Sequence, residues 1–154
     1  MIKITEALDP AAIAVVRGLF LEYQEALGVD LSFQGFSAEV EGLPGDYAPP
    51  RGRLLLARDG DSVAGCVAMR ALTDDTCEMK RLYVCPPFRA GGVGRQLAER
   101  VIAEARAAGY RRMNLDTLPT MAGAQRLYER LGFTEIAPYR HNPIVGSRFL
   151  TLQL

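Results

Sequence analysis

The feature that most constrains this chain is a glycine-rich turn at residues 89–94, which separates a strand-like run from a helix-like one. The apolar run at 82–84 is broken by Pro86 and Pro87, and apolar residues then recur at helical spacing over 93–105. Glycines at the opening of a helix let the backbone approach a ligand closely, and the first N–H groups of a helix have no partner inside it. The sequence therefore predicts a strand, an anion-binding turn and a helix in succession.

The composition predicts a single globular domain over residues 1–154. With 154 residues, of which 49% are hydrophobic and 23% charged, the chain can bury a core without disulfides or a structural metal. Its 18 basic residues cancel its 18 acidic ones, which argues against a protein that binds nucleic acid through a large positive charge. Three cysteines without a C-x-x-C spacing predict neither disulfides nor a metal site, and they favour a reducing compartment.

The apolar segment at 11–21 lacks the pattern of a targeting or membrane-spanning segment. It is interrupted by Arg17, it has no basic leader or cleavage site, and it is too short to cross a bilayer. We therefore expect a cytoplasmic protein that does not associate with a membrane.

The charges are unevenly distributed along the chain. Residues 1–50 hold two basic and eight acidic side chains, whereas residues 80–112 hold eight basic and two acidic ones. Solvated helix faces account for such runs as well as function does. The functional interpretation is an anionic ligand bound by the second half and a cationic one by the first.

Periodicity and turn residues predict the remaining elements. Asp9-Pro10 opens a helix that Gly28 closes, and Asp59-Gly60 predicts a hairpin turn. Three strands thus precede the glycine-rich turn, and a strand-helix-strand unit begins at it. The predicted strands lie at 2–5, 53–58, 62–72, 77–85, 112–117, 133–137 and 148–153, and the helices at 10–27, after Ser37, at 93–108 and at 121–131.

One interpretation of the turn is a dinucleotide-binding loop, and hence an NAD(P)-dependent oxidoreductase. Gly92 and Gly94 would supply the first two glycines of G-x-G-x-x-G, and Asp116 lies at the distance of a ribose-binding acid. However, Leu97 stands where the third glycine belongs. In addition, six residues (85–90) separate Val84 from Gly91, the first glycine of the turn. Three strands joined by hairpins upstream also do not build a doubly wound sheet.

The other interpretation rests on a resemblance. Arg89-Ala90-Gly91-Gly92-Val93-Gly94 matches the [Q/R]-x-x-G-x-[G/A] signature of the GNAT superfamily of N-acetyltransferases, and residues 124–133 resemble the A-x-x-L-Y-x-x-x-G-F segment of that superfamily. The resemblance covers nearly the whole chain. It implies a mixed α/β (α+β) fold, in which helices flank a twisted, mostly antiparallel central sheet with one splayed parallel strand pair.

The same resemblance implies a site for acetyl-CoA, with no metal. Leu82, Tyr83 and Val84 would offer backbone groups to the pantetheine arm of the coenzyme. Backbone N–H groups of the following turn would bind its pyrophosphate. The residues implied there are Arg89, Ala90, Gly91, Gly92, Val93, Gly94 and Arg95.

Two side chains are candidates for the chemistry. Tyr128 corresponds to the tyrosine that the resemblance implies as general acid for the departing thiolate, and its alternative role is that of a core aromatic. Glu78 resembles an acidic general base, and its alternative role is an ion pair with Lys80 or Arg81. Strand alternation predicts that Glu78 shares a face with Lys80, Leu82 and Val84. Met121 stands where many relatives carry an asparagine that contacts the coenzyme.

The resemblance implies acetyl transfer to a primary amine by direct attack, on a small molecule or a peptide. The acidic first third favours a cationic amine, and a homodimer is compatible with the resemblance. A coenzyme-binding sensor without catalysis is the alternative from a different class. Residues expected at the acceptor are Tyr23, Phe33, Phe36 and Tyr139.

Overall fold

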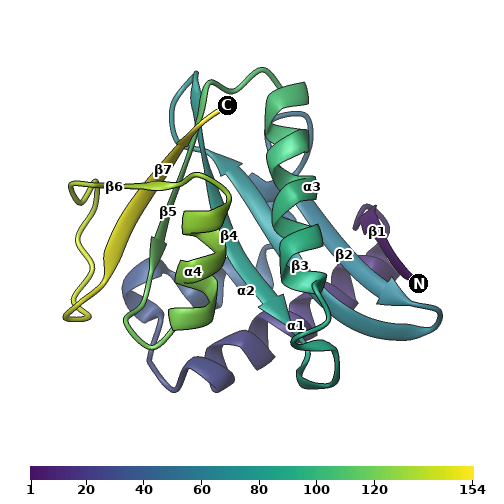
Figure 1. Ribbon diagram of the computed structural model, residues 1–154. Coiled ribbons are helices and arrows are strands. Elements are labelled where there is room, and N and C mark those ends of the chain that lie inside the picture. The colour runs from purple at the N-terminus through teal and green to yellow at the C-terminus, as the bar shows by residue number, and fades with distance from the viewer.

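A sheet of seven strands in the order β1-β2-β3-β4-β5-β7-β6 runs through the computed structural model, which describes residues 1–154 (Figure 1). Neighbouring strands are antiparallel except for β4 and β5, which pair in parallel. The mostly antiparallel sheet with one parallel pair confirms the predicted fold class. The strands are β1 (Ile2–Glu6), β2 (Arg53–Asp59), β3 (Ser62–Ala71), β4 (Thr76–Val84), β5 (Arg112–Thr117), β6 (Thr134–Ile136) and β7 (Arg148–Gln153).

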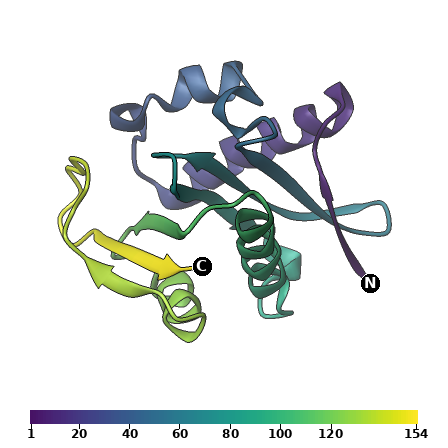
Figure 2. The ribbon, with the colours of Figure 1, turned by 90° about the horizontal axis from the view of Figure 1, so that it is seen from above.

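Helices cover both faces of the sheet, α3 and α4 on one and α1 and α2 on the other (Figure 2). The α-helices are α1 (Pro10–Leu27), α2 (Phe36–Glu41), α3 (Val93–Ala107) and α4 (Ala122–Arg130), and short 3-10 helices are η1 (Ser32–Gln34), η2 (Gly45–Tyr47) and η3 (Pro86–Phe88). All predicted elements are present, with small shifts at their ends. None of these helices combines the length and the apolar character that a bilayer crossing requires.

Each face of the sheet has its own hydrophobic core. In β2, Leu55 packs in the core under α3, while Leu54 and Leu56 pack in the core under α1. This follows from strand geometry, since successive side chains point to opposite faces and both faces are covered. The apolar run of β2 therefore anchors both helical layers to one sheet.

The parallel pairing of β4 and β5 is short. It joins Thr76–Glu78 to Arg112–Asn114, and beyond those residues the two strands diverge. In the diverging part β4 carries a bulge, because Lys80 pairs with Ala68 while Tyr83 pairs with Cys66. The residue inside the bulge, Arg81, has φ 61°, a conformation that side chains other than glycine rarely adopt.

The bulge corrects one prediction. We expected Glu78, Lys80, Leu82 and Val84 to share a face of β4, but Lys80 bonds to η1 on the α1 side while Leu82 and Val84 pack in the core under α3. The extra residue at the bulge shifts the two-residue alternation by one. The prediction was wrong for this reason.

Gly65 lies so close to the bulged part of β4 that adding a side chain there tests this packing. A Cβ at this position would overlap the carbonyl oxygen of Tyr83, so we expect Gly65→Ala to destabilise the protein by about 2 kcal/mol. Thermal unfolding should then show a melting temperature lower by about 4–8 °C. Gly18→Ala is the matched control, because Gly18 lies inside α1 with free space around it, and this change should stabilise by about 0.5–1 kcal/mol. A Gly65→Ala protein as stable as the parent would contradict the close approach.

Candidate functional site

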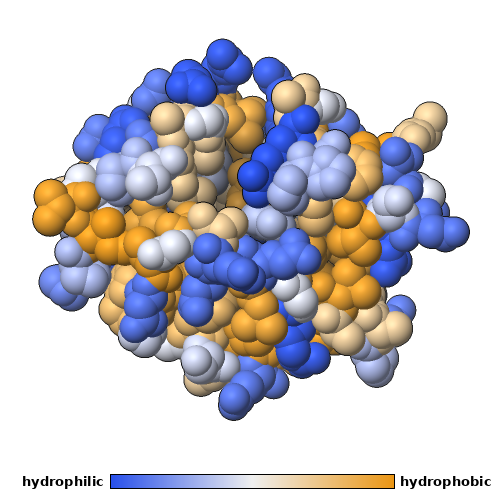
Figure 3. Space-filling view, turned by 90° about the horizontal axis from the view of Figure 1, so that it is seen from below, coloured by the Kyte–Doolittle hydropathy of each residue, from blue (hydrophilic) through white to orange (hydrophobic).

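A cleft of about 510 Å³ opens where β4 and β5 diverge. Tyr23 and Leu27 of α1 line one side, the end of β4 and the glycine-rich turn form the base, and Leu127 of α4 closes the other side. The view from this end of the sheet shows hydrophobic side chains exposed between hydrophilic ones (Figure 3). A cleft with mostly apolar walls suits a long, partly apolar ligand.

The glycine-rich turn beside this cleft contains a row of unpaired donors. None of the six consecutive N–H groups from Ala90 to Arg95 donates to a backbone carbonyl or a side chain, and the first paired one after them is that of Gln96. Gly92 has φ 83° and precedes the first residue of α3, a conformation that favours glycine. Free N–H groups at the positive end of a helix dipole bind anions such as a pyrophosphate.

Most of the residues predicted for the coenzyme line the cleft. These are Leu82, Tyr83, Val84, Arg89, Ala90, Gly92, Val93 and Gly94. Gly91 does not line it, and the Arg95 side chain pairs with Glu99 at 2.6 Å, so these two residues offer only their N–H groups. The Arg89 side chain donates from Nε to the Val84 carbonyl at 3.0 Å, which ties the turn to the end of β4.

Tyr128 lies beside this cleft in a narrower pocket of about 30 Å³, which shares Tyr23, Leu82 and Met121 with it. Its ring packs against Phe133 with centroids 5.6 Å apart. Burial raises the pKa of the Tyr128 hydroxyl, so the group holds its proton at neutral pH. Tyr128 is thus both a core aromatic and a protonated hydroxyl at the pocket.

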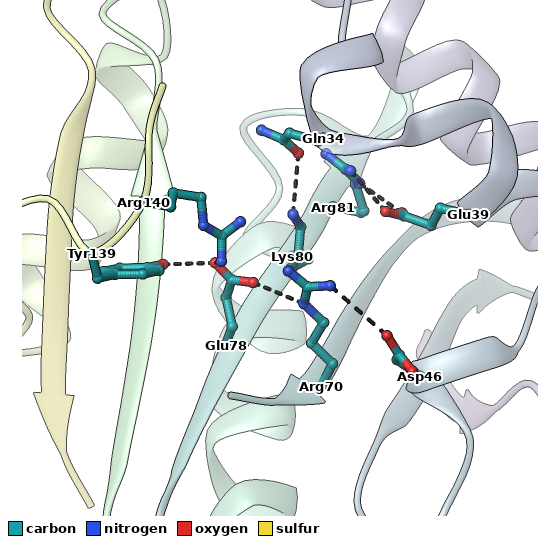
Figure 4. A network of polar contacts seen from close by, with 9 residues as sticks. All are labelled: Gln34, Glu39, Asp46, Arg70, Glu78, Lys80, Arg81, Tyr139 and Arg140. Carbon is teal, nitrogen blue, oxygen red and sulfur yellow. Dashed lines mark hydrogen bonds and ion pairs between the residues drawn. The ribbon is translucent and has the colours of Figure 1, made fainter. Parts of the chain in front are cut away.

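Glu78 is fully buried at the centre of a charged network (Figure 4). Arg70 Nε donates to its Oε1 at 3.0 Å, Tyr139 donates its hydroxyl to Oε2 at 2.7 Å, and Arg140 also donates to Oε2. Burial alone would raise the pKa of Glu78, but the charges of Lys80 and Arg140 hold it below its usual range. The carboxylate is therefore ionised, and both of its oxygens accept hydrogen bonds.

Two further cations lie next to Glu78 on β4. Arg81 makes a bidentate pair with Glu39 of α2, at 2.9 Å for both hydrogen bonds, and its guanidinium lies 5.0 Å from the centre of the Phe36 ring. Lys80 donates from Nζ to Gln34 Oε1 at 3.1 Å. Burial and the nearby Arg81 charge lower the pKa of Lys80 to about 8.

The four residues that we expected at the acceptor do not lie together in the structure. Tyr23 lines both the cleft and the narrower pocket. Phe36 is buried beneath Arg81 and Phe33 packs against the core under α1, and neither lines the cleft or the pocket. Tyr139 also lines neither of them, since its hydroxyl is bound to Glu78.

Sequence reasoning missed several residues of the narrower pocket. Lys80 was considered only as an ion-pair partner and Asp116 only as a ribose ligand, yet both line this pocket together with Gln34. Asp116 accepts a hydrogen bond from Asn142 at 3.2 Å. The available signal was the presence of three charged residues, Glu78, Lys80 and Arg81, within one strand in the middle of the predicted sheet, where a buried charge is rare unless it is paired.

Comparison with known proteins agrees with this geometry. Residues 19–133 match the model of the acetyltransferase (GNAT) family. The chain is 41% identical over 138 residues to an uncharacterized N-acetyltransferase of Schizosaccharomyces pombe, covering 88% of this chain and 85% of the relative. It is 32% identical to an uncharacterized N-acetyltransferase of Dictyostelium discoideum, covering 100% of this chain and 99% of the relative.

A solved structure extends the comparison to the fold. A Salmonella typhimurium protein in complex with its cofactor acetyl-CoA superimposes with a TM-score of 0.70 at 24% identity, covering 99% of this chain and 93% of that one. The family match spans most of the chain, and both curated relatives match it over nearly their full length. The chain therefore belongs to the acetyltransferase (GNAT) family and is an acyltransferase.

Proposed function

We propose that this protein transfers the acetyl group of acetyl-CoA to a primary amine by direct attack. The observation that carries the proposal is the row of free N–H groups from Ala90 to Arg95 beside a cleft with apolar walls. The N–H groups suit a pyrophosphate and the apolar walls suit a pantetheine arm. Leu82 and Val84 lie at the end of β4, where they would direct the thioester toward the pocket of Tyr128.

In the proposed reaction the amine nitrogen attacks the thioester carbon, a C–N bond forms and the C–S bond breaks. Tyr128 donates its proton to the departing thiolate. Burial raises the pKa of its hydroxyl, so the group is protonated at neutral pH and a proton is present when the thiolate forms. A substrate ammonium must lose one proton before it can attack, and the nitrogen loses a second proton as the amide forms; the first passes to solvent by way of the group that contacts the amine, and the second restores the Tyr128 hydroxyl. The Asp116 carboxylate lines the same pocket as Tyr128 and would contact the amine there.

Glu78 serves in this proposal as a positioning residue and not as the base. Its three donors occupy both carboxylate oxygens, and the pKa of Glu78 is lowered, which weakens it as a proton acceptor. Through Arg140 it holds the loop after β6 against β4. This revises the role that the sequence suggested for it.

A ligand test separates acetyl transfer from nucleotide-dependent oxidation. Acetyl-CoA at a hundred times its dissociation constant should raise the melting temperature by about 5–10 °C, because it binds only the folded protein. NAD and NADP at the same concentration should leave the melting temperature unchanged. Stabilisation by NAD or NADP alone would contradict the proposed acetyl transfer. Stabilisation by acetyl-CoA without release of coenzyme thiol across a broad amine panel would favour a sensor.

Tyr128→Phe tests the general acid. We expect kcat for thiol release to fall about 10²-fold or more, because the thiolate would leave without a proton, while stabilisation by acetyl-CoA is retained. Tyr110→Phe is the matched control, since Tyr110 is a buried tyrosine away from the pocket whose hydroxyl donates to the Arg51 carbonyl at 2.7 Å. That variant should lose about 1 kcal/mol of stability and keep its kcat. An unchanged kcat in Tyr128→Phe would remove this role.

Glu78→Gln distinguishes a positioning residue from a base. The amide keeps the shape but removes the charge that pairs with Arg140 and leaves Arg70 only its longer contact with Asp46, so we expect stability to fall on the order of 3 kcal/mol. The acid-side inflection in the plot of kcat/KM against pH should persist, because another group accepts the proton. Loss of that inflection, with acetyl-CoA binding intact, would restore Glu78 as the base.

A further inference from the structure

Lys80 is a buried cation without an anionic partner. The residue is only 6% exposed, and its Nζ donates to the neutral amide of Gln34, while no carboxylate oxygen lies within 4.0 Å of it (Figure 4). A lysine ammonium carries three donors, and its burial without a counter-charge is costly. The side chain lines the pocket of Tyr128, so the place for the missing anion is inside that pocket.

The carboxylates next to Lys80 are already committed to other cations. Glu78 is held by Arg70 and Arg140, and Glu39 is held by both nitrogens of Arg81. Glu39 cannot turn to Lys80 without leaving the buried Arg81 unpaired, and Glu78 acts on Lys80 only at a distance while its oxygens bind Arg70, Arg140 and Tyr139. No carboxylate of the protein therefore makes a direct ion pair with this ammonium.

Asp116 supplies the opposite charge in the same pocket. Its Oδ2 accepts a hydrogen bond from the Asn142 amide at 3.2 Å, and no cation lies within 4.0 Å of its carboxylate. The pocket thus contains one ammonium and one carboxylate that make no direct ion pair, and Tyr128 lines the same pocket. A ligand complementary to this arrangement carries an ammonium and an anionic group on one small framework.

The size of the pocket restricts that ligand further. Its volume is about 30 Å³, and it joins the wider cleft at Tyr23, Leu82 and Met121. A ligand that contacts Lys80 and Asp116 must therefore be compact at that end, with the rest of its framework in the wider cleft. A polyamine would leave Lys80 unpaired, and the N-terminus of a peptide carries an amide where the anion is required.

Resting on the proposed acetyl transfer, we propose that the acceptor is a free amino acid whose carboxylate binds Lys80 and whose amine binds Asp116. This places the nucleophilic nitrogen beside Tyr128, at the mouth of the cleft that would hold the thioester. Lys80 acts in binding and specificity, whereas Asp116 contacts the reacting amine.

Matched acceptor pairs test the substrate class. Each standard L-amino acid is compared with its carboxamide, for example L-alanine with L-alaninamide, by release of coenzyme thiol from acetyl-CoA. The amide has the more readily deprotonated amine, so intrinsic reactivity favours it. We nevertheless expect kcat/KM to be at least about tenfold higher for the acid of the preferred pair, as a charge-assisted contact would give.

Two variants separate the two contacts. Lys80→Met keeps the length and apolar stem, so we expect it to raise KM for the acid about tenfold and to leave KM for the amide within about twofold. Asp116→Asn should impair the acid and the amide equally, because both carry the amine. Lys3→Met is the control, since Lys3 is the only other lysine of the chain and is exposed on β1.

A binding measurement keeps this proposal separable from acetyl transfer. Thermal shifts with coenzyme A present are recorded for the same acids and amides. If no acceptor is turned over, stabilisation by acids alone that is lost in Lys80→Met still supports the amino-acid site and rejects only the transfer. Equal turnover or equal binding of acids and amides overturns the proposal, and so does a Lys80→Met protein that still prefers acids.

Discussion

The short register of β4 against β5 is the constraint on which the rest of the structure depends. Parallel hydrogen bonding between β4 and β5 stops at Glu78 and Asn114. Beyond these residues the edge of β4 that faces β5 is unpaired, which leaves backbone groups and space for a ligand. Had the two strands stayed paired, their side chains and hydrogen bonds would have closed both the cleft and the narrower pocket. The anion-binding turn would then be an exposed loop without a cavity beneath it.

The gap between the strands joins two chemically different faces of the sheet. On the α3 side the cleft offers backbone N–H groups and apolar walls, which suit a long phosphorylated thioester. On the α1 and α2 side it offers buried side-chain charges, of which Lys80 and Asp116 remain uncompensated. In the proposed reaction the coenzyme and the acceptor would thus be recognised by different chemistry and would meet beside Tyr128.

The sequence predicts the frame of this site better than its acceptor half. Strands, helices and the glycine-rich turn follow from short-range periodicity and turn residues, and Tyr128 follows from a family-like segment. The partners of Glu78 do not, because Tyr139 and Arg140 are separated from it by 61 and 62 residues and only tertiary packing brings them together. The family resemblance implies a bulge in the strand before the turn, but its position cannot be predicted from the residues, since Arg81 is not a residue whose side chain favours positive φ.

Arg81 explains how the chain maintains that unfavourable backbone. Its guanidinium donates two hydrogen bonds to the Glu39 carboxylate and lies over the Phe36 ring. These contacts with α2 offset the backbone strain of Arg81 at φ 61°. Because both oxygens of Glu39 are paired with Arg81, this carboxylate of α2 is not available to Lys80. One buried arginine thus maintains the bulge in β4 and leaves the Lys80 ammonium without a direct ion pair in the pocket of Tyr128.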